Sequence, residues 1–369
     1  MPSVLNMITD KDRLDFSQNY SIQRNYLGDI LFPDIKTENL EAEYERLSEG
    51  MELPTAAMVH AFDTEAAIGV RPSFEKITVE KLLIKEKINQ SERLAHLLSR
   101  GVRESRLVDY VYDDMNNLAN SVKTRTEIAK MEVMATGKMT IKENNLDMEI
   151  DYGVNKFKDL TGWEDAAHDI ISDIEEMVAM ARTAGYSVNA VLTSDKALGY
   201  MRKNTGIVNA INGVNGARIV TKSQVETLLN ELFGISTVTT NEAAYGVPTS
   251  NNKGRTAARF FPEDKFTLYQ SGVNGRVGSG LWGVTPEEER QGAFTDLNMK
   301  QFITISQWAT PDPVAEWTKA SGVFIPVLPN PFAMVIGTIG EEVVDDENGG
   351  GDDVPGEGGD DENGEVTGA

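Results

Sequence analysis

The chain has 369 residues with 40% hydrophobic and 7% aromatic content, a formal net charge of −23, and no cysteine. This composition is typical of a globular protein, and the length allows two domains or one elaborated domain. The lack of cysteine excludes disulfides, thiolate metal sites and cysteine nucleophiles. No apolar stretch approaches the ~20 residues of a membrane helix, and residues 1–10 lack the basic start and apolar core of a signal peptide. We therefore expect a protein that is made and used in the cytoplasm.

The charge is distributed unevenly along the chain. Residues 341–369 hold twelve Asp or Glu and no Lys or Arg, which leaves −11 of the −23 for residues 1–340. Binding to DNA phosphates requires clustered Lys and Arg, so this balance predicts a surface that repels DNA. The acidic tail is rich in Gly and Asn and has little apolar surface to offset the entropy of ordering. We expect it to be disordered.

The first 90 residues predict an N-terminal segment followed by a β-ribbon; the segment is either an arm that lies on neighbouring subunits or an ordinary extension packed on its own domain. Residues 1–52 show weak periodicity, and Glu38 to Glu49 could form a short charged helix. Residues 53–90 are typical of strand, loop and strand, with strands at 56–62 and 75–85. A two-stranded ribbon of this length is barely stable alone in water. The ribbon must therefore lie on its own domain or on a neighbouring subunit.

A long helix follows the ribbon. Asn89 and Glu92 have the spacing of a capping pair. Apolar residues then recur at intervals of three and four, as in Val111, Met115 and Leu118. A single helix from Glu104 to Ala135 would be ~48 Å long, with Lys130 near its negative end and Gly137 as its stop. One apolar stripe on so long a helix indicates a scaffold beneath a sheet.

The rest of the chain predicts alternating helices and strands. The expected strands and hairpin are 138–142 with 146–152, 188–193, 235–239, 266–270, 301–306 and 322–328. The expected helices begin at the capping box Thr161/Glu164, near Asp195, and at the capping box Thr221/Gln224. Gly- and Asn-rich segments at 204–216 and 243–255 are expected to be exposed loops.

Chemically suggestive patterns are weak. Gly137-Lys138 is not a phosphate loop, because position 132 is Glu and position 139 is Met. The spacing of glycines at 275–280 favours a surface turn over a dinucleotide site. The three histidines are far apart, and His168 is expected to be solvated. The acidic runs at 287–289 and 113–114 are typical of solvated faces. We predict no catalytic, cofactor-binding or metal-binding residue, and no enzyme.

Several landmarks share their order with one protein family. They are Leu27–Pro33, Lys130–Thr140, Met148–Gly153, Pro262–Leu268, Gly280–Gly283 and Trp308–Pro313. In this order and spacing, residues 26–339 resemble the lambda-type major capsid protein (protein E) family of tailed bacteriophages. The resemblance implies an α+β fold of the Hong Kong 97 type, with an N-arm, an extended E-loop, a P-domain with a long spine helix, and an A-domain.

The resemblance also implies a division of the chain. The expected parts are an N-terminal arm at 1–52, the E-loop and flanking strands at 53–90, a P-domain with spine helix at 91–160, an A-domain at 161–296, return strands of both domains at 297–340, and the acidic tail at 341–369. Within these parts, the E-loop lies at roughly 61–80 and the spine helix at roughly 92–135. The acidic tail departs from the family pattern.

The family implies two kinds of contact residue. The E-loop would contact a neighbouring subunit through Asp63, Glu65, Arg71, Pro72 and Phe74. Two loops would face the centre of the capsomer through Asn209, Asn212, Asn251, Asn252 and Lys253.

The implied function is self-assembly into hexamers and pentamers of an icosahedral head. The head would be assembled in the host cytoplasm, become part of the virion, and enclose double-stranded DNA without sequence-specific binding. Scaffolding, portal and decoration proteins are the implied further partners. Two alternatives stay open: an encapsulin-like compartment shell, and an α/β ligand-binding protein or hydrolase, which would need a convergent polar pocket.

Overall fold

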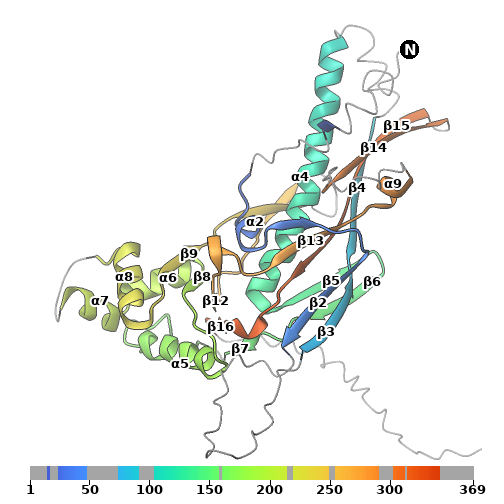
Figure 1. The fold of residues 1–369 in the computed structure, drawn as a ribbon. Helices are drawn as coiled ribbons and strands as arrows, with labels where there is room; N and C mark the ends of the chain where they lie inside the picture. The colour runs from blue at the N-terminus through green and yellow to red at the C-terminus, as the bar shows by residue number, and fades with distance from the viewer. Residues whose placement is uncertain are drawn as a thin grey trace, which may run out of the picture.

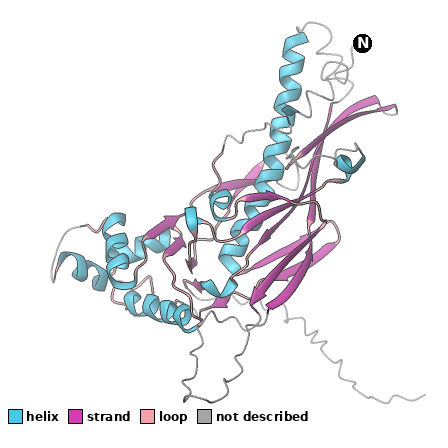
Figure 2. Cartoon of the chain, viewed as in Figure 1, coloured by secondary structure: helices cyan, strands magenta, loops and turns pink. Residues whose placement is uncertain are grey.

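The computed structural model describes residues 15–16, 24–47, 74–90, 104–157, 160–213, 219–248, 254–290, 302–311 and 314–340. One long helix, α4 (Glu104–Thr136), runs along a sheet-rich body, and the helices between residues 170 and 233 gather in a lobe beside one end of α4 (Figure 1). Figure 2 shows the same division, with long strands on one side of α4 and the helical lobe on the other.

The body is built on a five-stranded sheet. Its strands are β1 (Asp34–Lys36), β4 (Leu82–Gln90), β13 (Ser279–Gly283), β14 (Thr304–Pro311) and β15 (Val314–Val327). The long strand β15 pairs with β4 along one edge and with β14 and then β13 along the other, all antiparallel. β1 adds to β13 in parallel. The landmark at 308–313 begins in β14, whose last residue Pro311 pairs with Val314 of β15.

Helix α4 covers one face of this sheet, as its single apolar stripe predicts. Met115, Leu118 and Val122 are fully buried against Ile305 and Phe324 of the sheet. At ~1.5 Å per residue, the 33 residues of α4 extend about 50 Å. The helix ends before Gly137, whose φ of +70° favours glycine.

Two hairpins and a short helix complete the body. They are the ribbon β2 (Glu41–Leu47) with β3 (Phe74–Glu80), the hairpin β5 (Lys138–Glu143) with β6 (Leu146–Asp151), and helix α2 (Leu27–Leu31). The hairpin β5–β6 turns through Asn144 and Asn145, both at positive φ, as expected for a two-residue turn. Its prediction is confirmed.

The lobe has its own mixed sheet, in the order β7 (Asn155–Lys156), β16 (Met334–Thr338), β12 (Lys265–Tyr269), β8 (Ala190–Thr193) and β9 (Thr237–Thr240). Its helices are α5 (Ile170–Thr183), α6 (Asp195–Lys203), α7 (Thr205–Asn212) and α8 (Lys222–Phe233). The strands β10 (Ala244–Pro248) and β11 (Arg255–Arg259) form an antiparallel hairpin, and Tyr245 and Phe260 pack in the same core as Tyr26. The lobe core includes Ile174, Met177, Val225 and Phe266, all fully buried.

The capping box at Thr221/Gln224 is confirmed. Thr221 caps the first turn of α8, and Gly234 ends the helix in the left-handed conformation. The capping box expected at Thr161/Glu164 is wrong, because α5 begins nine residues later with Asp169 as its N-cap. The side chain of Asp169 accepts the Ser172 N–H, so the helix has a cap closer to its apolar stripe.

Three further predictions in the first 90 residues are wrong. The segment 38–49 contains strand β2, because Glu41, Ala42, Glu43 and Tyr44 alternate with the period of a strand that pairs with β3. The strand expected at 75–85 is two strands separated by buried Lys81. Asn89 lies in β4, so it does not cap the long helix. The strand expected at 56–62 and residues 91–103 lie outside the described residues.

The two expected loops of the lobe contain regular structure. Segment 204–216 holds α7, which Asn204 caps and whose Ile207 is buried in the lobe core. Segment 243–255 holds β10 and the start of β11. The expected surface turn at 275–280 runs into β13, and at Gly278, just before that strand, Phe32 and the Val327 carbonyl oxygen leave no room for a Cβ. The tail, 341–369, lies outside the described residues.

Candidate assembly surfaces

The segment Tyr26–Lys36 is fastened to α4 by buried charges. Lys130, which is fully buried, lies 2.6 Å from the Asp29 carboxylate and 3.0 Å from that of Asp34. Lys123 forms a second ion pair with Asp34. Burial acts to raise the pKa of Asp34, but the ammonium groups of Lys130 and Lys123 outweigh it and hold that pKa below its usual value. The expected role of Lys130 at the helix end is therefore wrong: it binds the arm.

Beside this cluster, Glu127 and Gly28 are in direct contact. Glu127 is 2% exposed, and its Oε1 accepts the Gly28 N–H at 3.0 Å. A Cβ on residue 28 would lie 2.2 Å from Glu127 Oε2, so only glycine allows α2 to approach α4 this closely. Tyr26 Oη and Thr124 Oγ1, 3.0 Å apart, add a hydrogen bond at the edge of the contact.

Helix α9 (Pro286–Arg290) connects the arm to the sheet. Its Glu288 binds Lys36 at 2.9 Å, and its Glu287 forms an ion pair with Lys319 of β15. Glu288 is only 6% exposed. The interpretation of residues 287–289 as a solvated run is therefore wrong for these two, because each pairs with a lysine from another element.

The face of the sheet opposite α4 carries aromatic and basic side chains. Alternation along β15 places Trp317 and Lys319 on this side, while Ala320 and Phe324 face α4. Trp308 of β14 lies directly opposite Trp317, and Lys87 of β4 lies 4.3 Å from the Trp317 ring centroid. We call this surface the lysine face; its residues are Lys85, Lys87, Lys319, Trp308 and Trp317.

The ribbon β2–β3 presents an acidic edge. Glu41 and Glu80 are directly opposite each other and both are exposed, whereas the next pair includes Ala42, which is 1% exposed. Like charges in directly opposed positions destabilise a hairpin. The base of the ribbon therefore packs on its own chain through one face and directs carboxylates outward from the other.

Most of the predicted contact residues lie outside the described part of the chain. These are Asp63, Glu65, Arg71, Pro72, Asn251, Asn252 and Lys253. The backbone of Phe74 begins β3. Asn209 and Asn212 are half-buried and lie on α7, not in a loop. Figure 1 places α7 at the end of the molecule away from β14 and β15. Of the predicted contact residues, the structure therefore places only Phe74, Asn209 and Asn212.

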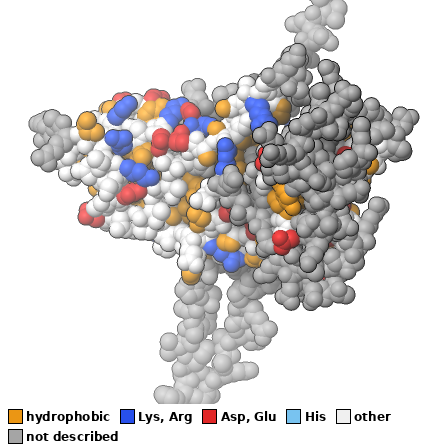
Figure 3. Space-filling view, turned by 90° about the horizontal axis from the view of Figure 1, so that it is seen from above, with side chains coloured by type: hydrophobic (Ala, Val, Ile, Leu, Met, Phe, Trp, Pro, Cys, Tyr) orange, Lys and Arg blue, Asp and Glu red, His pale blue; other side chains and the backbone are white. Residues whose placement is uncertain are grey.

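The helical lobe carries both signs of charge. Figure 3 shows Lys and Arg side chains next to Asp and Glu side chains across one face of the lobe. At the end of β11, Arg259 forms ion pairs with Glu242 at 2.6 Å and with Glu263 at 3.1 Å. The Arg259 hydrogen bond, opposed by burial, holds the pKa of Glu242 below its usual value. Such neutralised pairs are typical of a protein surface that does not steer one sign of ligand.

His168 is not simply solvated, as the sequence led us to expect. It precedes α5, and its Nε2 lies 2.7 Å from Asp173 Oδ2. The same carboxylate oxygen accepts Trp163 Nε1–H at 2.7 Å. Trp163 is 1% exposed and packs edge-on against Phe266. His168 and Asp173 therefore anchor a buried tryptophan, a structural role for this pair.

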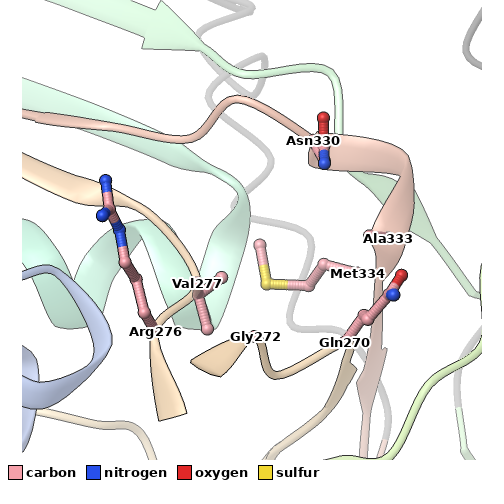
Figure 4. A pocket seen from close by; sticks show the side chains of 7 residues that line it. All are labelled: Gln270, Gly272, Arg276, Val277, Asn330, Ala333 and Met334. Carbon is pink, nitrogen blue, oxygen red and sulfur yellow. The ribbon is translucent and has the colours of Figure 1, made fainter. Parts of the chain in front are cut away.

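The two hollows described next lack the side chains that acid–base catalysis needs. A hollow of 150 Å³ is lined by Gln270, Gly272, Arg276, Val277, Asn330, Ala333 and Met334 (Figure 4). A second, of 550 Å³, adds Pro33, Val273 and Asn274. Figure 4 shows Arg276 pointing away from Gln270 and Met334, and its Nε donates to the Gly278 carbonyl at 2.9 Å. The described residues lining either hollow include no carboxylate, histidine or hydroxyl, so they provide no acid–base pair.

The described residues lack two other features. They contain no cluster of three His, Asp or Glu side chains suited to a metal ion. Within the same part of the chain, no helix is both long and apolar enough to cross a membrane.

Sequence reasoning missed the charged cluster under the arm and the pairing of the two tryptophans. A signal existed for the first: Lys123, Glu127 and Lys130 are spaced by four and three residues, so they share one face of the long helix. These three residues lie beside the apolar stripe of the long helix, which indicates that the helix has a second buried face. Trp308 and Trp317 flank a turn at 311–314, and equal distance from a hairpin turn predicts a cross-strand pair.

Comparisons with known proteins agree with this fold. The family model described as phage major capsid protein E matches residues 18–339. A putative capsid protein of an Escherichia coli CFT073 prophage is 17% identical, with a TM-score of 0.53 over 90% of this chain and 99% of that one. A phage-related protein from Bordetella bronchiseptica RB50 is 12% identical, with a TM-score of 0.51 over 90% and 96%.

At these identities the solved structures show the fold, and they confirm the expected α+β capsid architecture. No curated protein matches the chain. The family model covers the arm, the long helix, the lobe and the return strands together. The chain therefore belongs to the phage major capsid protein E family and is a major capsid protein that forms a phage head.

Proposed function

We propose that copies of this chain assemble into hexamers and pentamers of an icosahedral head enclosing double-stranded DNA, with the E-loop ribbon of each copy lying on the next. In this proposal the chain is divided into six parts, at 1–52, 53–90, 91–160, 161–296, 297–340 and 341–369. The placement of the return strands supports this division, because β14 and β15 join the sheet on α4 whereas β16 joins the sheet of the lobe. Scaffolding, portal and decoration proteins, and assembly in the host cytoplasm, belong to the same proposal.

The observation that carries the contact between copies is a charge match. Glu41 and Glu80 oppose each other on the ribbon, an arrangement that costs stability within one subunit. Lys87 and Lys319 oppose each other on the lysine face. Glu287 pairs with Lys319, but Lys87 is exposed above Trp317. A contact between copies would place exposed Lys87 against the carboxylates of Glu41 and Glu80 and relieve the repulsion between these two.

The same contact explains how weak individual surfaces form a closed shell. An exposed ion pair is worth only ~0.2–1 kcal/mol. Each subunit, however, presents one ribbon and one lysine face, so the contact is head-to-tail and generates a ring when the rotation closes. Multivalent closure then strengthens contacts that are modest one at a time.

The test is a charge exchange in the full chain. Glu80→Lys and Lys87→Glu, made singly, should each reduce the yield of shells seen by negative-stain microscopy. The double variant Glu80→Lys/Lys87→Glu restores opposite signs across the contact and should recover shells. Lys142→Glu, which makes the same charge change on the exposed hairpin β5–β6, should leave the yield unchanged.

The outcomes separate the parts of the proposal. A double variant no better than either single variant would refute this contact while leaving the head function standing. A wild-type chain that stays monomeric and turns over a small substrate would refute the head function and favour the α/β hydrolase. Shells purified with an enclosed enzyme in place of DNA would favour the encapsulin-like alternative.

A further inference from the structure

The charged cluster beneath the arm contains one more acid than base. The arm contributes Asp29 from α2 and Asp34 from β1, and α4 contributes Lys123 and Lys130. These four charges balance. Glu127 of α4 is the fifth member, and an ionised Glu127 gives the cluster a net charge of −1 in a site it shares with buried Lys130.

The two oxygens of Glu127 have different environments. Oε1 accepts the Gly28 N–H at 3.0 Å. Oε2 is buried and has no hydrogen-bond partner among the described residues. An ionised carboxylate places charge on both oxygens, so a buried oxygen without a partner favours the neutral form. A neutral carboxyl keeps Oε1 as the acceptor for Gly28 and leaves the four other charges balanced.

We propose that Glu127 is a proton-controlled latch that fastens the segment Tyr26–Lys36 to helix α4. The segment is held while the carboxyl is protonated, and it loosens when the carboxyl ionises, because the charged form is more stable in water than under α2. This latch is a property of each subunit and is independent of the contact between copies. The strength with which the arm is docked on the body therefore depends on pH.

The direction of the pH effect follows from the environment of the carboxyl. Burial raises the pKa of Glu127 from its usual 4.5 to about 7, although the Gly28 hydrogen bond and Lys130 act to lower it. A pKa raised in the docked state makes docking strongest below 4.5 and progressively weaker up to about 7. Within that window the docking equilibrium falls by up to about tenfold per pH unit. The pKa of Asp34, the other shifted carboxyl of the cluster, lies below this window.

The experiment measures hydrogen exchange of the Gly28 and Phe32 amides in the full chain from pH 5 to pH 7.5. The Gly28 amide donates to Glu127, and that of Phe32 donates to the Gly28 carbonyl at 2.8 Å. After correction for intrinsic exchange rates, their protection should fall by roughly 60-fold across this range. The amide of Gly234, which is bonded within α8, should keep its protection.

Glu127→Gln is the decisive variant, because the amide keeps an oxygen for Gly28 but cannot ionise. In this variant the protection of the Gly28 amide from hydrogen exchange should be independent of pH. Glu132→Gln, a matched change on the same helix where the carboxylate instead accepts the Thr140 N–H, should preserve the wild-type fall. Equal pH dependence in wild type and Glu127→Gln would overturn the latch. A direct carbon NMR titration of the wild-type Glu127 carboxyl with a midpoint below 5 would also overturn it, whether or not the variant folds.

Discussion

Trp308 and Trp317 lie directly opposite each other on β14 and β15, with ring centroids 6.4 Å apart and ring planes 14° apart. Lys319 lies over the first ring at 5.7 Å and Lys87 over the second at 4.3 Å. The four side chains form a cross-strand stack near the β14–β15 turn. Such a stack favours this register of the hairpin.

We predict that Trp317→Ala lowers the free energy of unfolding by about 2 kcal/mol, because it removes a half-buried ring together with the stacking contact between this ring and Trp308. Urea unfolding followed by fluorescence measures the shift in midpoint. Lys142→Ala, on an exposed hairpin, is the control and should change stability by less than ~0.5 kcal/mol. An unchanged midpoint in Trp317→Ala would show that the stack carries no stability.

Leu118 on the buried face of α4 gives the second prediction. It is 1% exposed and packs in the core between α4 and the sheet. Leu118→Ala should cost roughly 2–5 kcal/mol, because it deletes buried methyl groups and leaves a cavity. Leu146→Ala, at a position 55% exposed, is the matched control. The same cost expected at Val111 stays a prediction, since its side chain lies outside the described part of α4. Equal midpoints for Leu118→Ala and wild type would mean that the face is not a core.

Two glycines should respond in opposite directions to the same substitution. A Cβ at Gly278 would lie 2.3 Å from the Val327 carbonyl oxygen and 2.6 Å from the Phe32 ring, whereas a Cβ at Gly199 in α6 meets nothing within 4 Å. Gly278→Ala should therefore destabilise the chain by more than ~1 kcal/mol, and Gly199→Ala should stabilise it by ~0.4–1 kcal/mol. Thermal unfolding of both variants checks this. A destabilised Gly199→Ala would contradict the open space beside α6.

The sequence predicted the fold where local pattern and tertiary packing agree. The apolar stripe of α4, the Asn-Asn turn of β5–β6 and the capping box of α8 each specify their element within a few residues. The prediction failed where long-range pairing decides. Strand β2 pairs with β3 across 26 residues that lie between Leu47 and Phe74, and charge-rich composition alone favoured a helix there.

The candidate surfaces were harder to predict than the fold. Gly28, Glu127 and Lys130 meet only because α2 folds back across α4, a contact between residues about 100 positions apart. Nothing in the local sequence around Gly28 distinguishes it from a turn glycine. The residue pattern predicted the ribbon at 53–90, whereas only the family resemblance identified which of its residues would contact a neighbouring subunit. Those residues stay predictions, because they lie outside the described part of the ribbon.

We predict that the loop at 63–74 contacts a neighbouring subunit. Arg71→Ala with Phe74→Ala should impair head formation and leave the isolated subunit folded, because the ribbon is too long and polar to be stabilised by its own chain alone. Circular dichroism of the subunit and microscopy of heads are the two measurements. Lys142→Ala is the control for a surface change elsewhere. Normal heads from the double variant would refute the contact.

The acidic tail gives the last prediction. Deleting residues 341–369 should leave both the fold and head assembly intact, because twelve carboxylates without a counter-charge repel one another when packed at one site. Its frequent glycines also raise the entropy cost of ordering the segment. Counting intact heads by microscopy, with and without the deletion, tests this expectation.

The tail should also keep heads apart at low salt, since exposed like charges repel over a Debye length of ~10 Å at 0.1 M. Heads that lack 341–369 should therefore associate more readily in dilute buffer, and the difference from wild type should shrink above ~0.15 M salt. Light scattering over a salt series measures the association. Protease treatment of intact particles supplies the second readout, because an exposed tail is cut while the heads survive. Protease resistance of the tail in the particle, or loss of heads on deletion, would show that the segment is structural.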